Sequence, residues 1–217
     1  MRESARQRRI GQACAAAAAA VLLATCGSEG DNRQATAAAA QRVTEAPTGT
    51  SGAAEQNCAQ VEVNRWIDVP TVAGEPAMRL PQPPNWESES EFIKPPMKLV
   101  LRNNTLADGQ GVPAITVATG EVIGPDKSAS DALDDSIEGF ENVGAQNITQ
   151  RAIAVCGYSA RRVTYTAESV SASVVAVAVP VKGTTSVVIV AAQSVTPLNP
   201  IFRADSELIL SGMQIAS

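Results

Sequence analysis

The feature that most constrains this fold is a series of β-patterned segments in the second half of the chain. Valine, isoleucine, threonine and alanine are concentrated in four stretches, 148–155, 161–166, 172–179 and 186–193. This composition is typical of strands. The last two stretches are separated by Pro180–Thr184, which suits a hairpin loop. The pattern predicts an antiparallel sheet rather than a doubly wound parallel one.

Two more strands and two helices complete the expected domain. The strands are predicted at 99–102 and 114–123. Ser128 and Asp131 resemble a capping box that begins one helix, and Asn199, which precedes a proline, begins a second. This order of elements predicts an α+β fold, in which an antiparallel sheet is covered on one face by helices.

Residues 1–25 have the layout of an export signal. Four arginines within the first nine residues precede an apolar run from Ala13 to Ala24. The run is about a dozen residues long, whereas a membrane-spanning helix needs roughly 20 apolar residues, so a cleaved signal peptide is favoured. The adjacent Arg8 and Arg9 leave twin-arginine export as an alternative, but the residues after them do not continue that motif.

The apolar run ends in a sequence similar to a lipobox. Leu23, Ala24 and Thr25 precede Cys26, which predicts that Cys26 receives diacylglycerol, with palmitate as an expected acyl chain. The alternative is an ordinary signal peptide with an incidental cysteine. Two or more acyl chains anchor a protein stably, so we expect a lipoprotein at the extracytoplasmic face of the cell membrane.

Residues 26–57 carry the predicted anchor and a tether. Beyond Cys26 the segment is rich in Ala, Gly, Ser, Thr, Gln and Glu, and Val43 is its one large aliphatic residue. Such a composition buries too little apolar surface to fold, so a disordered tether with a span of about 30 Å is expected.

Residues 58–217 form the predicted folded domain, and two cysteines fall within it. In an exported chain Cys58 and Cys156 are expected to form a disulfide. The alternative is a thiol active site, but the chain has no Cys-x-x-Cys motif and no histidine to activate a thiolate.

The charge balance excludes a nucleic-acid-binding role. Removal of residues 1–25 takes away four arginines and one glutamate, which changes the formal net charge from −5 to −8. Phosphate recognition needs clustered Lys and Arg, and the basic residues here are scattered among acids. The same balance leaves acyl chains, rather than charge, to hold the protein at an anionic membrane.

The residue types also argue against catalysis. The chain has no histidine, which excludes Ser-His-Asp and Cys-His sites and a His-ligated zinc. The acids of the first helix have the spacing of a solvated face, and no calcium-binding loop is present. We therefore expect no enzyme activity, no cofactor and no metal site.

Two features bear on binding. In 174–179, three valines point to one face of the sheet, and Ala176 and Ala178 point to the other. Small side chains either let a helix approach closely or leave room for an apolar ligand. Trp86 and Phe92 lie beside proline-rich turns and are candidates for contact with a ligand or partner, or for capping the core.

Several short segments together resemble the mycobacterial LpqN/LpqT lipoproteins. They are Pro-Gln-Pro-Pro-Asn-Trp at 81–86, Leu-Arg-Asn-Asn at 101–104, Cys-Gly-Tyr at 156–158, Val-Thr-Tyr-Thr-Ala at 163–167 and Arg-Ala-Asp-Ser-Glu-Leu-Ile-Leu at 203–210. The resemblance spans nearly all of residues 58–215. It implies an actinobacterial envelope lipoprotein with a PsbP-like α/β sandwich, and it supplies no catalytic residue.

These expectations lead to two functional hypotheses. The first is a membrane-anchored envelope lipoprotein that binds or helps to transfer an apolar envelope lipid or glycolipid. The alternative is an accessory module of the cell-envelope machinery that binds other envelope proteins. An apolar pocket beneath the helices would favour the first hypothesis, and a filled core with an exposed apolar patch would favour the second.

Overall fold

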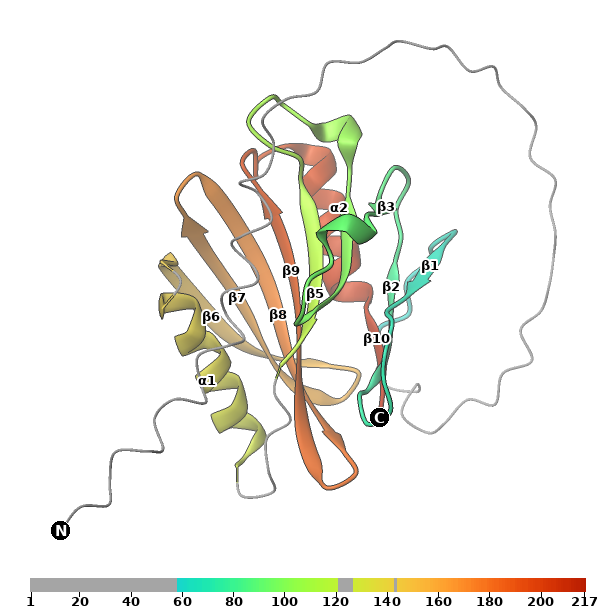
Figure 1. The fold of residues 1–217 in the computed structure, drawn as a ribbon, viewed down its shortest axis with the longest axis vertical. Coiled ribbons are helices and arrows are strands. Elements are labelled where there is room, and N and C mark those ends of the chain that lie inside the picture. The colour runs from blue at the N-terminus through green and yellow to red at the C-terminus, as the bar shows by residue number, and fades with distance from the viewer. Residues whose placement is uncertain (1–57, 121–126, 143) are drawn as a thin grey trace.

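The computed structural model describes residues 58–120, 127–142 and 144–217. The predicted signal peptide, the predicted lipidation site Cys26 and the predicted tether to residue 57 lie outside the described residues. Within these residues the chain forms a seven-stranded sheet, a three-stranded sheet and two α-helices (Figure 1). The predicted α+β class is confirmed.

The large sheet is antiparallel throughout, in the order β3-β4-β5-β9-β8-β7-β6. The four β-patterned stretches are its longest strands, each a few residues longer than predicted. The strands are β3 (Glu87–Ser88), β4 (Met97–Arg102), β5 (Ala114–Thr119), β6 (Gln146–Val155), β7 (Tyr158–Ala167), β8 (Val170–Val181) and β9 (Thr184–Ser194). Two 3₁₀ turns, Ser90–Phe92 and Asn104–Leu106, flank β4.

Tight turns set the register of β6 to β9. Cys156-Gly157 joins β6 to β7 and Lys182-Gly183 joins β8 to β9, and all four residues have positive φ. Two successive residues of positive φ define the type I′ turn, whose twist matches that of antiparallel strands. The predicted Pro180–Thr184 loop is therefore shorter than expected, because β8 continues to Val181.

The three-stranded sheet was not predicted from the sequence. It consists of β1 (Trp66–Asp68), β2 (Ala77–Pro81) and β10 (Gln214–Ala216), paired in the order β1-β2-β10. Strands of three to five residues are too short to show a period-two pattern. This sheet lies beside α2, at the right of Figure 1.

Both helices begin where their caps predict. In α1 (Ala129–Asn142) the Ser128 Oγ accepts from the Asp131 N–H at 3.2 Å, and the Asp131 carboxylate accepts from the Ser128 N–H at 3.3 Å. This reciprocal pair is a capping box. In α2 (Pro200–Gly212) the Asn199 side chain accepts from the backbone N–H groups of residues 201 and 202.

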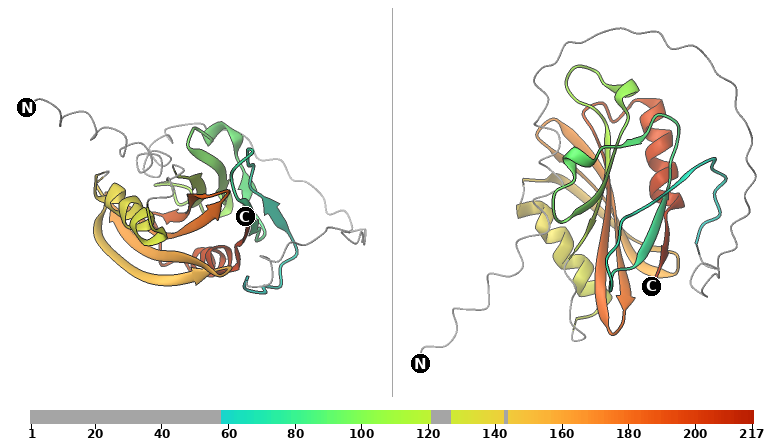
Figure 2. Two further views of the ribbon diagram at one scale, coloured as in Figure 1. Left: turned by 90° about the horizontal axis from the view of Figure 1, so that it is seen from below. Right: turned by 45° about the vertical axis from the view of Figure 1, so that its right-hand side comes forward.

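The helices lie on opposite faces of the large sheet, which corrects the expectation that one face is covered. Along β8, Ala176 and Ala178 pack in one cluster with α1, and Val175, Val177 and Val179 pack in another with α2 and the small sheet. Residues 174–179 are all buried. A strand that is buried at successive positions needs cover on both faces of its sheet. This requirement explains why α1 lies in front of the sheet and α2 behind it (Figures 1 and 2).

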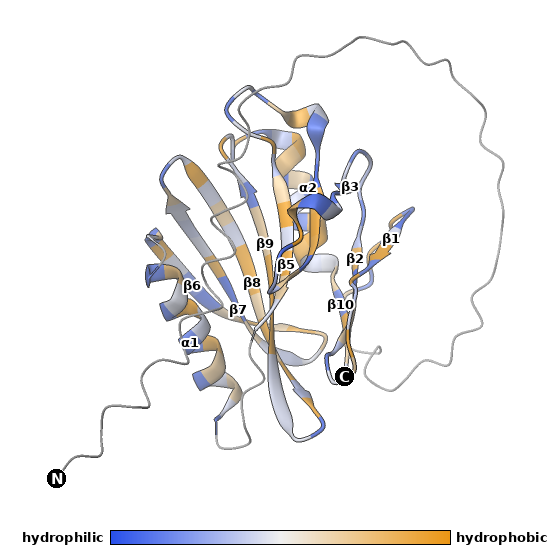
Figure 3. Ribbon diagram, viewed as in Figure 1, coloured by the Kyte–Doolittle hydropathy of each residue, from blue (hydrophilic) through white to orange (hydrophobic). Residues whose placement is uncertain are grey.

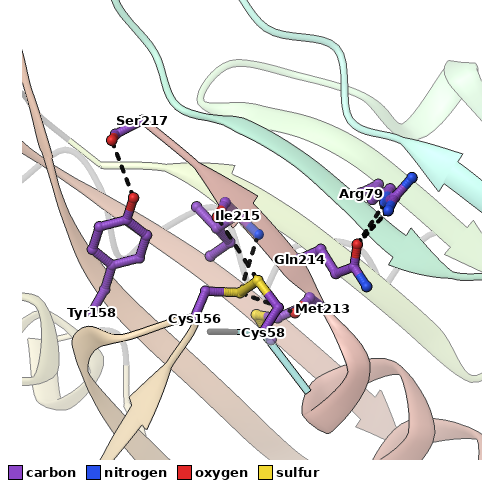
Figure 4. Close-up of a disulfide and its surroundings, with 8 residues drawn as sticks. All are labelled: Cys58, Arg79, Cys156, Tyr158, Met213, Gln214, Ile215 and Ser217. Carbon is purple, nitrogen blue, oxygen red and sulfur yellow. Dashed lines mark hydrogen bonds between the residues drawn. A yellow bond between two sulfur atoms is a disulfide. The ribbon is translucent and has the colours of Figure 1, made fainter. Parts of the chain in front are cut away.

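A disulfide between Cys58 and Cys156 ties the start of the domain to the turn between β6 and β7 (Figure 4). Both cysteines are buried, and the Ile215 N–H of β10 points to the Cys156 sulfur at 3.4 Å. Nearby, the Tyr158 hydroxyl is hydrogen-bonded to Ser217, and Arg79 of β2 donates to Gln214 of β10 at 2.8 Å. The disulfide therefore lies where the two sheets and the C-terminus meet.

Replacing Ala176 by leucine tests how closely α1 packs on the sheet. Ala176 is fully buried against α1, so the added carbons must displace the helix or adopt strained rotamers. We expect Ala176→Leu to lower the free energy of unfolding by about 1–3 kcal/mol in urea titration. Ala107→Leu, at an exposed loop position, is the control and should change it little. Equal effects of both variants would contradict close packing.

Removal of the disulfide tests its contribution to stability. The two cysteines are 98 residues apart, and closing a loop of about that length removes roughly 4–5 kcal/mol of chain entropy from the unfolded state. In urea titration, the double variant Cys58→Ser, Cys156→Ser should therefore have a lower free energy of unfolding, by up to roughly 4–5 kcal/mol. A thiol reductant should destabilise the natural protein and leave the double variant unchanged; an equal response of both would count against the bridge.

Candidate functional site

A surface groove of about 800 Å³ lies between the N-terminal half of α2 and the face of β7, β8 and β9 that α2 covers. This volume lies within the usual range of ligand sites, about 300–1,000 Å³. The lining combines hydroxyl, charged and apolar side chains. They are Asn147, Arg162, Thr164, Tyr165, Thr166, Ser171, Ala172, Ser173, Ala192, Pro197, Pro200, Phe202, Arg203, Ala204, Ser206 and Glu207.

The floor of the groove arises from a change of residue type along one face of the sheet. On β8 this face carries valine at 175, 177 and 179 and then serine at 173 and 171. On β7 it carries alanine at 160 and then threonine at 164 and 166. The C-terminal half of α2 packs on the valines, whereas its N-terminal half faces the small polar side chains. Small side chains beneath the helix leave the space that forms the groove.

Arg162 stands in the wall of the groove with most of its side chain buried. Its Nη2 lies 2.7 Å from the Glu207 carboxylate of α2, and its Nε donates to the Ser173 hydroxyl at 3.0 Å. Only 14% of the Arg162 side chain is exposed. The ion pair joins β7 to α2 and balances the Arg162 charge, and a guanidinium has five N–H donors, more than these two bonds use.

The first turn of α2 does not provide an anion site. The Asn199 side chain accepts from two backbone N–H groups of this turn, its carbonyl accepts from the Arg203 N–H, and Pro200 has no N–H. The Arg162 charge is paired with Glu207, but Arg203 also lines the groove, so the lining combines hydroxyls and N–H donors with one further positive charge. The hydroxyls suit a polyhydroxyl ligand.

The rim of the groove is apolar where β9 leads into α2. Leu198 is 82% exposed and Ile201 is 56% exposed, and each directly follows a proline, Pro197 or Pro200, that lines the groove. Exposed large apolar side chains beside a binding groove often mark contact with a second apolar surface. The groove therefore combines a polar floor with an apolar edge.

Trp86 lies in the core beneath α2 and not in the groove. Its ring is 1% exposed, its Nε1–H donates to Asp205 of α2 at 2.8 Å, and its ring centroid lies 6.5 Å from that of Phe202. The structure thus shows the core-capping role that the sequence left open for Trp86. Because Phe202 lines the groove, Trp86 supports the groove wall from behind.

Phe92 also lies away from the groove. Its ring packs against Met97 and Val100 on the far side of β4, and the Arg102 guanidinium lies 4.6 Å from the ring centroid. Trp86 and Phe92, singled out together from the sequence, are therefore not brought together in one site. Neither residue lines the groove beside α2.

The small alanines of β8 serve close packing. Ala176 and Ala178 are buried against Leu133, Ile137 and Phe140 of α1, and these side chains fill the space between helix and sheet. The acids on the opposite side of α1 are exposed, as expected for a solvated face (Figure 3).

The described residues show no group of three or more His, Cys, Asp or Glu side chains placed to hold a metal ion. In that same part of the chain, no helix is both long and apolar enough to cross a bilayer.

Burial raises the pKa of Tyr165 above its usual 10.0, and a hydrogen bond with Gln193 partly offsets the shift. Its ring stacks on Phe140 of α1 at 5.2 Å, so the shift comes from packing in the core.

Glu75 forms a polar cluster at the other end of the sheet. Its carboxylate lies 2.7 Å from the Lys98 Nζ and accepts hydrogen bonds from the Thr119 hydroxyl and the Val72 N–H. Burial raises the pKa of this carboxyl, but the bonds from Lys98, Val72 and Thr119 together lower it by more, and the net pKa lies below 4.5. These contacts fix the loop between β1 and β2 against β4 and β5.

Sequence reasoning did not identify the groove residues Arg162, Ser173 and Glu207. The available signal was the polar interruption of an apolar face, where serine at 171 and 173 continues the row of valines at 175, 177 and 179. This signal indicates a site only when it is known that α2 crosses over these two serines.

The chain was compared with protein families, curated protein sequences and solved structures. No protein-family model and no curated protein sequence matches the chain. Among solved structures, LpqN of Mycobacterium tuberculosis, described as involved in cell envelope biogenesis, superposes with a TM-score of 0.57. It is 19% identical, and the match covers 71% of this chain and 93% of LpqN. The domain therefore has an LpqN-like fold.

A second solved structure, the PsbP protein CyanoP of Synechocystis sp. PCC 6803, is more distant. Its TM-score is 0.42 at 13% identity, and the match covers 73% of this chain and 96% of CyanoP.

The Glu75 cluster predicts a specific pH dependence of stability. A carboxyl whose pKa is lowered by folding contributes stability above its unfolded pKa and loses it as the pH falls through the lower folded value. Glu75→Gln should therefore lower the melting temperature near neutral pH, and the difference from the natural protein should shrink below pH 4.5. Melting curves from about pH 7 to pH 3 test this. Glu138→Gln, on the exposed face of α1, is the control, and an equal effect there would contradict the assignment.

Proposed function

We propose that this protein is a non-catalytic, membrane-anchored envelope lipoprotein that binds a glycolipid, with the sugar headgroup in the groove and the acyl chains at its apolar rim. The observation that carries the proposal is the groove itself, with a floor of hydroxyl side chains and a rim of exposed Leu198 and Ile201. An amphipathic ligand matches both parts, whereas a wholly apolar lipid would leave the floor without partners.

The groove chemistry supports a sugar as the headgroup. Thr164, Ser171 and Ser173 present hydroxyls that can donate or accept, and Arg162 presents donors whose charge is balanced by Glu207. Sugar hydroxyls both donate and accept, so such a lining can satisfy several of them at once. This refines the hypothesis of an apolar cleft, since the lining combines hydroxyl and charged side chains with apolar ones, and the most exposed apolar side chains lie at the rim.

The location of the protein rests on other observations. Residues 1–26 have the pattern of a lipoprotein signal, and LpqN, whose fold the domain shares, is described as involved in cell envelope biogenesis. A domain on a tether of about 30 Å at the membrane could reach lipid headgroups in the same leaflet. Anchoring and groove together favour handling of envelope glycolipids over the alternative of a protein-binding accessory module.

Native mass spectrometry of the full chain, purified from an actinobacterial host, tests the proposal. A co-purifying glycolipid should appear as a mass addition at near-unit occupancy. Arg162→Gln should lower that occupancy and weaken rebinding of the recovered lipid by about tenfold or more, because a ligand loses bonds to a charged donor.

Arg161→Gln is the matched control for this experiment. Arg161 adjoins Arg162 in the sequence but points to the other face of the sheet, where it contacts Ser130 and Asp134 of α1. The Arg161→Gln variant should leave the glycolipid occupancy unchanged. A ligand-free mass under conditions that preserve lipid on a known carrier would refute glycolipid binding, and equal losses in both variants would refute the groove as the binding site. Cross-linking would then test the accessory role.

A further inference from the structure

Among the residues that the structure describes, the strand β6 is the free edge of the large sheet, and no strand of that part of the chain pairs with its outer side. It is the last strand in the order and pairs along its length with β7 alone. Seven of its ten residues are exposed, and the helices make their main contacts with β7, β8, β9 and β2. We propose that β6 is a dimerisation surface, on which β6 of a second copy of this chain pairs in antiparallel register centred on Ala152.

The turn between β6 and β7 determines which backbone groups face outward. In a two-residue hairpin the flanking residues, here Val155 and Tyr158, form a hydrogen-bonded pair. Hydrogen-bonded and non-hydrogen-bonded pairs then alternate along the strands. Residues 149, 151, 153 and 155 therefore bond to β7. The N–H and C=O groups of Gln150, Ala152 and Ala154 point away from the sheet, toward any added strand.

The edge lacks most of the features that prevent strand addition. Natural edge strands are commonly very short or carry prolines, several charges or bulges. The opposite edge, β3, has only two residues, whereas β6 has ten, with no proline and Arg151 as its one charge. A register irregularity separates Gln146 from Thr149, which leaves 149–155 as a regular ladder. A regular exposed ladder of this length is suited to pairing.

Charge and hydrogen bonding select both the partner and the register. If the two-fold axis passes through Ala152, then Gln150 pairs with Ala154 of the second copy and Ala152 pairs with its own equivalent, so every outward group of these residues is satisfied. Arg151 then lies opposite Ile153. A register centred on Arg151 would place like charges directly opposite, which is destabilising. A register centred on Ile153 would place Gln150 opposite residue 156 of the turn. The outward N–H and C=O groups of Gln150 would then lose their strand partner. The sequence of β6 is thus complementary to itself.

The dimer has a geometric consequence for the groove. Side chains of directly paired residues point to the same face of a sheet. The α2 faces of the two copies therefore lie on one side of a continuous sheet, and both grooves open on that side. The dimerisation proposal does not depend on what the groove binds.

Cysteine cross-linking of the full chain, produced in an exporting host so that the natural disulfide forms, tests the register. Paired residues at the axis have Cα atoms about 5.5 Å apart, which a disulfide can span. Ala152→Cys should give a covalent dimer on mild oxidation. Thr149→Cys should not, because Thr149 pairs with residue 155 of the second copy and lies about 20 Å from its own equivalent.

Sedimentation velocity over a concentration series supplies the second measurement. The natural chain should show a monomer–dimer equilibrium, and Ala152→Lys should abolish it by placing two ammonium groups face to face. Ser159→Lys, on an exposed position of β7 away from the edge, should still dimerise. A monomer at every concentration, a dimer that survives Ala152→Lys, or equal cross-linking at 149 and 152 would overturn the proposal.

Discussion

The burial of β8 on both faces is the constraint on which the rest of the structure depends. Residues 174–179 are all buried, with Val174, Ala176 and Ala178 on one side and Val175, Val177 and Val179 on the other. An antiparallel sheet usually has one solvated face, but an apolar strand in its middle requires cover on both. The chain provides α1 for the alanine face, and α2 with the small sheet for the valine face. Alanine allows close approach of a single helix, whereas the larger valine face needs more elements to bury it.

The groove follows from the limits of that cover. The valine face ends at Ser173, and α2 extends past this point toward Pro200 with small polar residues below it. Apolar side chains here would be expected to pull the helix down onto the sheet and close the space. Instead, the Arg162–Glu207 ion pair joins helix and strand across the groove wall. Such a pair, with one partner largely exposed, contributes little stability, so its geometry matters more for holding a polar surface in place than for the fold.

Local signals in the sequence predicted most elements of the domain correctly, and relations between distant elements were not predictable in the same way. The capping box at Ser128 and the Asn199 cap each depend on a few neighbouring residues, so the helices begin where expected. The small sheet depends on pairing between β2 and β10, which are far apart in the chain and too short for a period. The helices were expected on one face because a sequence shows which side of a helix is apolar, but not which face of a sheet it covers. The groove could not be predicted for the same reason, because it depends on which face of the sheet α2 covers.

The position of α2, and therefore the shape of the groove, is fixed by contacts from three separate parts of the chain. Trp86, held by the proline-rich turn after β2, donates to Asp205 and packs on Phe202 at the N-terminal half of the helix. At the C-terminal end, Gly212 lies so close to Pro81 and Val61 that a Cβ atom would approach their side chains to 2.8 Å. The disulfide secures the neighbouring segment through Cys58, close to Met213 and Ile215. A helix fixed at both ends cannot settle onto the small polar floor between them. The groove is therefore a consequence of how α2 is held at both of its ends.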